Sequence, residues 1–139
     1  MIFQYSQFPV PDQKGVFIYR TTIPIIFKYK TNFILVEALV DSGADQTILP
    51  VEIATALNIP LDESSATYFF GAGGNTFEVY RSQFAIQHSL RAAGFQPIQW
   101  STKVYFAQSQ PTILLGQDGF LNRFRVTLDG IKKEIEIRP

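Results

Sequence analysis

The segment that contains Asp41, Ser42 and Gly43 holds the residues best suited to chemistry. Asp-Ser-Gly alone is weak evidence, because all three residue types favour turns. Asp41, however, directly follows a nearly continuous apolar run at residues 33–40, and the apolar segment Thr47–Leu49 comes soon after. A carboxylate between two such runs is pushed toward the interior, where ionisation is costly, and perturbed carboxylates serve acid–base catalysis. Asp41 is therefore a candidate catalytic residue.

The sequence around this segment predicts the elements that position it. The run at residues 33–40 is typical of a strand buried on both faces. A short helix is expected at residues 50–58, from Pro50 to a C-terminal cap at Asn58. Thr31-Asn32 is a plausible hairpin turn. Strands before the helix are predicted at residues 16–20, 22–30, 32–40 and 47–49.

The second half of the chain has a similar order of elements. Residues 71–75 form a glycine-rich connection between two strands, and residues 87–99 show no clear period and are interpreted as a connection. Asp129-Gly130 predicts a two-residue hairpin turn. Further expectations are strands at 67–70, 76–86, 102–108 and 112–116, a turn at 117–119, a short helix at 120–124 and a closing hairpin at 124–137.

Composition indicates one mostly β domain. The chain has 139 residues, of which 46% are hydrophobic, and 13 Phe and 6 Tyr favour strands over a helical bundle. Residues 1–15 are expected to be an N-terminal arm, either extended or frayed, and residues 16–139 the folded domain.

Charge and residue usage exclude several classes of function. Twelve basic residues balance twelve acidic ones, which gives no reason to expect a nucleic acid or an anionic membrane as partner. With no Cys and one His, disulfides, thiolate chemistry and a structural zinc site are not expected, and no cofactor or metal is predicted. No signal peptide and no apolar run of about 18 residues is present, so a cytoplasmic location is expected.

Three segments resemble the retropepsins, the retroviral-type aspartic proteases and their cellular and bacterial relatives. ALVDSGADQTIL at 38–49 is similar to the family's active-site segment, GAGGN at 71–75 to its flap tip, and ILLGQDGFL at 113–121 to its apolar-glycine segment. They occur in the family's order and at its approximate spacing. The resemblance implies a single-domain retropepsin-like acid protease fold, mostly β and closed β-barrel-like, with a flap hairpin and one or two short helices.

The same resemblance implies an aspartic endopeptidase that acts on peptide or protein substrates. A single Asp-Ser-Gly is present, so the chain needs a second copy of itself, and the two Asp41 carboxylates of the homodimer would activate a water molecule. Asp118 is not expected to be the missing partner, because Gly116-Gln117-Asp118 matches the structural counterpart in the pseudo-repeat.

The resemblance also implies roles for the residues beside Asp41. Ser42 would hydrogen-bond across the dimer axis, Gly43 would allow close approach of substrate and adopt a positive φ, and Asp45 would contact the substrate backbone. A turn-capping role for Asp45 is the alternative. Ala44 cannot donate a hydrogen bond to the carboxylate, so activity at mildly acidic to near-neutral pH is expected.

The glycine-rich turn would close over the substrate. By the resemblance, its backbone amides form a flap tip that excludes water. A plain hairpin loop is the alternative. The residues concerned are Gly71, Ala72, Gly73 and Gly74.

Other interpretations remain open. Gln117 stands where many family members have Arg, so an ion pair with Asp45 is excluded. His88 is interpreted as a solvent-exposed loop residue instead of a member of a Ser-His-Asp triad. A non-catalytic dimerisation or peptide-binding module, or a scaffold within a larger assembly, are the alternatives to an enzyme.

Overall fold

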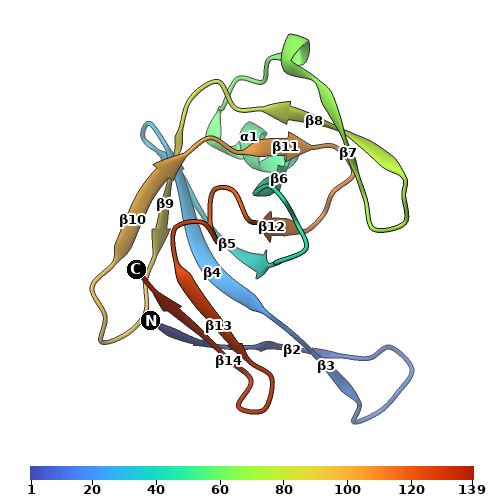
Figure 1. The fold of residues 1–139 in the computed structure, drawn as a ribbon, viewed down its shortest axis with the longest axis vertical. Helices are drawn as coiled ribbons and strands as arrows, with labels where there is room; N and C mark the ends of the chain where they lie inside the picture. The colour runs from blue at the N-terminus through green and yellow to red at the C-terminus, as the bar shows by residue number, and fades with distance from the viewer.

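β-Strands make up about half of the chain in the computed structural model, which describes residues 1–139 (Figure 1). The helical elements are α1 (Val51–Leu57) and one turn of 3₁₀ helix, η1 (Glu63–Ser65). No helix has the length and apolar character needed to cross a membrane. The strands are β1 (Ile2–Gln4), β2 (Ser6–Pro9), β3 (Phe17–Arg20), β4 (Thr22–Tyr29), β5 (Asn32–Val40), β6 (Ile48–Pro50), β7 (Thr67–Phe70), β8 (Thr76–Arg81), β9 (Ile86–Leu90), β10 (Ile98–Thr102), β11 (Tyr105–Ala107), β12 (Ile113–Leu115), β13 (Arg125–Asp129) and β14 (Glu134–Arg138).

The strands form three sheets. The largest has the order β10-β9-β4-β5-β12-β6-β11-β8-β7, and the others are β1-β14-β13 and the hairpin β2-β3. The mostly β, single-domain architecture predicted from the sequence is confirmed. β10 and β7 are the two edge strands of the largest sheet, and they do not pair with each other.

The centre of the largest sheet brings distant parts of the sequence together. β12 lies between β5 and β6; it is parallel to β5, with Leu115 opposite Val40, and antiparallel to β6, with Leu114 opposite Ile48. The ends of β5 and β12 therefore lie beside each other. The residues that follow β12 can therefore contact and position the residue that directly follows β5.

Helix α1 begins and ends where the sequence predicts. Pro50 occupies the N-cap position, and Asn58 adopts a left-handed conformation, from which its N–H donates to the carbonyls of Ala54 and Thr55. Leu57, Ala54 and Ile53 are buried in the main core. The helix thus covers part of the inner face of the sheet that carries β5 and β6.

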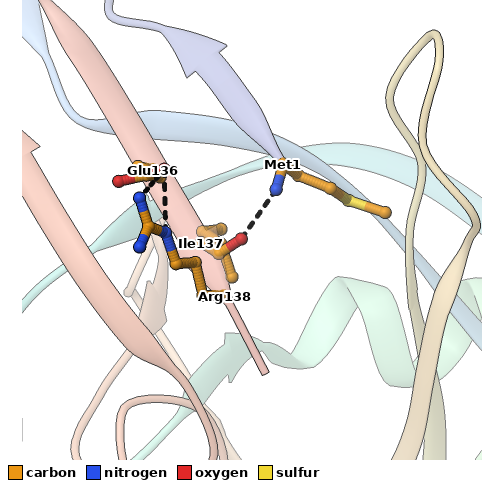
Figure 2. Close-up of polar contacts among 4 residues, drawn as sticks. All are labelled: Met1, Glu136, Ile137 and Arg138. Carbon is orange, nitrogen blue, oxygen red and sulfur yellow. Dashed lines mark hydrogen bonds and ion pairs between the residues drawn. The ribbon is translucent and has the colours of Figure 1, made fainter.

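The N-terminus is part of the core. The Met1 ammonium group donates to the Ile137 carbonyl at 2.7 Å (Figure 2). The Ile137 N–H donates in return to the Met1 carbonyl at 2.8 Å. On the exposed side of the same strand, Arg138 and Glu136 form an ion pair at 2.7 Å (Figure 2). β1 pairs with β14 and buries Phe3, so this segment is an extended strand and not a frayed end. The domain boundary predicted at residues 15 and 16 falls in the loop of the β2–β3 hairpin.

Residues 87–99 do not form the predicted connection. They contribute to the β9–β10 hairpin, and the strand predicted over 76–86 ends at Arg81. Ile86, His88 and Leu90 alternate along β9 and are buried. The alternation was not recognised in the sequence because the middle residue, His88, is polar. The expectation that His88 is an exposed loop residue is wrong, since its side chain is 0% exposed.

The predicted helix at 120–124 is also wrong, because these residues form turns. Five residues are too few to offset the cost of helix nucleation, and the N–H groups of Leu121 and Asn122 donate instead to the carbonyls of Gly116 and Gln117. The closing hairpin has a loop at 130–133, longer than the predicted two-residue turn.

Two details near β5 differ from the predictions. The β4–β5 turn is Lys30-Thr31, one residue earlier than expected, with Lys30 at φ 54°. β5 is buried on one face only: Phe33 is 71% exposed and Leu35 is 62% exposed. The expectation of burial on both faces fails because α1 packs on the inner face and no helix covers the outer one.

Candidate active site

Asp41 lies at the end of β5, and its backbone N–H donates to the Leu115 carbonyl at 3.1 Å. Its carboxylate Oδ1 accepts a hydrogen bond from the Gly43 N–H at 2.9 Å, and the Ala44 N–H donates to the Asp41 carbonyl at 3.3 Å. The side chain is half-buried. These contacts form a tight turn that fixes the carboxylate at the C-terminal end of β5.

Gly43 is favoured at this turn for a reason other than the predicted positive φ. The residues with positive φ do not include Gly43, so that expectation is wrong. A Cβ atom at this position would lie 3.2 Å from the Asp41 Oδ1 atom, which is tighter than ordinary van der Waals contact. Glycine therefore keeps the space beside the carboxylate free.

Residues 117 and 118 stabilise the Asp41 turn through hydrogen bonds to its backbone carbonyls. The Gln117 N–H donates to the Ala44 carbonyl at 2.8 Å, and the Asp118 N–H donates to the Asp45 carbonyl at 2.9 Å. The Gln117 side-chain amide donates to the Ser42 carbonyl at 2.9 Å. Gln117 thus supports the turn through uncharged hydrogen bonds. The sequence identified the missing Arg but not this side-chain contact.

Gly116 and Thr47 make the close approach of these two segments possible. A Cβ at Gly116 would collide with the Gln46 carbonyl and would lie 2.6 Å from the Ala44 carbonyl oxygen. The buried Thr47 hydroxyl donates to the Asp118 carbonyl at 2.9 Å and accepts from the Gly116 N–H at 3.3 Å. The sequence did not predict a role for Thr47; the available signal was a hydroxyl inside an apolar segment.

A cleft of about 650 Å³ lies above the Asp41 turn. Asp41, Gly43, Ala44 and Asp45 line one side of it, and Gly71-Ala72 line the other. The structure therefore brings together two predicted segments that are far apart in the sequence. The remaining wall is largely apolar and includes Phe69, Phe77, Ile48 and Leu114. Ser42, Gly73 and Gly74 belong to the same two turns but do not line the cleft.

The turn opposite Asp41 is a projecting hairpin end. β7 and β8 pair up to Phe70 and Thr76, and the Gly71 N–H donates to the Asn75 carbonyl at 2.7 Å. Gly74 has φ 79°, which L side chains rarely adopt. Phe70 is strongly exposed beside the cleft. The backbone and side chains of this turn are thus available to contact a ligand in the cleft.

Asp118 and His88 do not belong to the cleft. The Asp118 carboxylate accepts a hydrogen bond from the Asn122 side chain at 2.9 Å, in agreement with a structural role. Burial lowers the pKa of His88 to about 4; a hydrogen bond with the Ile86 carbonyl opposes this effect, and the charge of Arg123 adds to it. A Ser-His-Asp triad has no support, because His88 is enclosed by Phe27 and Trp100.

Comparisons with known proteins agree with this geometry. A family model described as "gag-polyprotein putative aspartyl protease" matches residues 29–123. Among solved structures, the chain is similar to EIAV protease complexed with the inhibitor HBY-793, with 22% identity and a TM-score of 0.53, over 71% of this chain and 83% of that one. This likeness supports the fold. No curated protein sequence matches the chain.

Proposed function

Because this chain belongs to the gag-polyprotein aspartyl protease family, a retropepsin-like family, we propose that it is an aspartic endopeptidase that acts as a homodimer. The observation that carries the proposal is the position of Asp41. Its carboxylate is fixed by the Gly43 N–H and lines a cleft opposite the Gly71-Ala72 turn. The largely apolar cleft suits an extended peptide substrate.

Two Asp41 carboxylates, one from each protomer, would share one proton. Two carboxyl groups about 3 Å apart cannot both ionise, because the two negative charges would repel each other; this is general for aspartic proteases. The ionised Asp41 draws a proton from a water molecule, and the protonated Asp41 donates its proton to the carbonyl oxygen of the scissile peptide bond. Water is the nucleophile, so no covalent enzyme intermediate forms.

The second protomer is required because this chain supplies only half of the pair. Apart from Asp41, the one carboxylate that lines the cleft is Asp45. Asp45 follows Asp41 within the same turn, is exposed and makes no ion pair. It is therefore suited to bind the substrate backbone. Ser42 is exposed and would hydrogen-bond across the two-fold axis, where it would hold the two Asp41 turns together.

The β7–β8 hairpin would act as the flap. Gly71 and Ala72 already line the cleft, and Gly73 and Gly74 complete the turn. Closure of this turn over a bound peptide would place backbone N–H groups on the substrate and exclude water from the reacting atoms.

Cleavage of a denatured protein library tests the proposal. Wild-type protein is expected to cleave peptide bonds at mildly acidic to near-neutral pH, and a statine peptide is expected to inhibit it. Asp41→Asn is expected to remove all cleavage, because asparagine cannot hold or transfer the shared proton. Cleavage that persists in Asp41→Asn would refute the proposal. A demonstrated dimer that cleaves nothing would support the non-catalytic binding module instead.

A further inference from the structure

The β2–β3 hairpin, residues 6–20, exposes an unusual amount of apolar surface. Five of its large apolar side chains have exposed fractions between 38% and 47%. Not one residue of β2 or β3 is buried. The five side chains are Phe8, Val16, Phe17, Ile18 and Tyr19.

Apolar side chains occupy both faces of this hairpin. Phe8 lies opposite Ile18, and Pro9 lies opposite Phe17, in adjacent positions of the antiparallel ladder. Because successive side chains of a strand point to opposite faces, Phe17 and Ile18 lie on different faces. A hairpin that ends in water normally has a polar outer face. Here neither face is polar.

The hairpin has little support within its own chain. It forms a separate two-stranded sheet, and an isolated two-stranded hairpin is marginally stable in water. Its contacts with the rest of the chain include a hydrogen bond between the Ser6 and Thr22 hydroxyls at 2.5 Å and the Lys133 ammonium 5.1 Å from the Tyr19 ring centroid. These contacts leave the apolar side chains exposed.

In the view of Figure 1, the hairpin projects from the body of the molecule on the same side as the loop between β7 and β8. In Figure 1 it extends to the lower right, the loop between β7 and β8 extends to the right above it, and the end of β5 lies between them. Asp41 directly follows that end of β5. A second molecule that brings its own Asp41 to the site would lie next to both projections.

We propose that the β2–β3 hairpin is the element that packs against a second copy of this chain. This inference rests on the proposed function, since a site with one Asp41 is incomplete without the partner. Burial of five half-exposed side chains would remove about 400 Å² of apolar surface per protomer, given about 150–250 Å² for each whole aromatic side chain. That is about half of one partner's share of a standard interface.

The polar end of the hairpin agrees with this orientation. Asp12 and Lys14 lie in its loop and are exposed, whereas four of the five apolar side chains lie on the strands and Val16 directly precedes β3. The strands would contact the partner along their length, and the charged loop would remain in water at the rim of the interface.

The test is the double variant Phe17→Arg/Ile18→Arg, which places a charge on each face of the hairpin. Sedimentation equilibrium would measure the dimer dissociation constant, and circular dichroism would verify the fold. We expect the constant to rise at least tenfold. The matched control is Phe33→Arg/Leu35→Arg, which changes two more exposed residues on the outer face of β5. It should dimerise like wild type.

Hydrogen exchange gives an independent measurement on the unaltered chain. Amides of residues 6–20 should exchange more slowly above the dissociation constant than below it, and amides near Phe33 should not change. The inference is overturned if the hairpin variant dimerises like wild type, if the Phe33/Leu35 control alone weakens the dimer, or if the wild type is monomeric even with a bound statine peptide.

The outcomes separate this inference from the proposed function. Asp41→Asn should dimerise normally and lack cleavage, which isolates catalysis from association. If the wild type cleaves nothing and the hairpin variant still dissociates the dimer, the interface is supported and the enzyme proposal fails. If the wild type cleaves as a monomer in an Asp41-dependent manner, both the interface and the shared carboxylate pair are refuted.

Discussion

Mild acid should destabilise this protein through His88. The His88 ring is 0% exposed, its Nδ1 atom is 2.8 Å from the Ile86 carbonyl oxygen, and its Nε2 atom has no hydrogen-bond partner. The Ile86 carbonyl accepts a hydrogen bond from the N–H at Nδ1, and burial of the unpartnered Nε2 favours the neutral ring in the folded protein. A second proton on Nε2 would place an unpaired charge among Phe27 and Trp100.

The magnitude follows from the pKa values in the two states. Burial lowers the pKa of His88 from its ordinary 6.5 to about 4 in the folded chain. Between these values the unfolded chain binds the proton more readily, so stability is full above pH 6.5 and falls as pH decreases toward 4. At 1.36 kcal/mol per pH unit, the complete loss is about 3 kcal/mol, most of which has occurred by pH 4.5.

The measurement compares urea unfolding of wild type and His88→Leu at pH 7, 5.5 and 4.5, at one protein concentration. Trp100, the single tryptophan, is stacked on His88 and reports unfolding by fluorescence. Contributions from the other titratable groups cancel in the difference between the two proteins. That difference should change by about 2 kcal/mol in favour of the variant as pH falls to 4.5. A difference independent of pH would refute the reasoning.

Three further predictions concern the Asp41 turn. Gly116→Ala should lower the free energy of unfolding by about 2 kcal/mol, measured in urea, because its Cβ collides with backbone carbonyls; Gly130→Ala, which meets nothing within 4 Å, is the control. Gln117→Leu should lose the hydrogen bond to Ser42 and lower kcat about tenfold with a smaller change in KM, measured by steady-state cleavage; an unchanged kcat would contradict the supporting role. Ala44→Thr should move the acidic limb of the pH–rate profile to lower pH, because a hydroxyl can donate to the carboxylate, and an unshifted limb would argue against it.

Much of the fold follows from local sequence patterns. Strands β4, β5 and β7 and helix α1 were predicted within a residue or two, because their apolar periods and turn residues are unambiguous. β9 was missed because His88 occupies an inward-facing position that is normally apolar. The helix expected at 120–124 was wrong because five residues are too few to offset the cost of helix nucleation, and the N–H groups of Leu121 and Asn122 donate to the carbonyls of Gly116 and Gln117 instead.

The candidate site, like the fold, could be predicted from the sequence only in part. The sequence placed Asp41, Gly43 and Gly71 in segments that the structure brings into one cleft. The contact from the Gln117 side chain to Ser42 joins residues far apart in the chain, and so does the Thr47 hydrogen bond to Asp118. Composition and spacing carry no signal for such pairs, since they depend on the order of β5, β12 and β6 in the sheet.

The hydrogen bonds from Gln117 and Asp118 to the Asp41 turn determine how the geometry of the turn responds to ionic strength. Gln117 and Asp118 hold the turn through an amide side chain and backbone groups, none of which carries a charge. Dissolved ions screen charge pairs near the surface but act little on such neutral contacts. The turn should therefore keep one geometry from dilute buffer to concentrated salt. A salt dependence of proteolysis would then report on encounter with substrate or on association of the protomers.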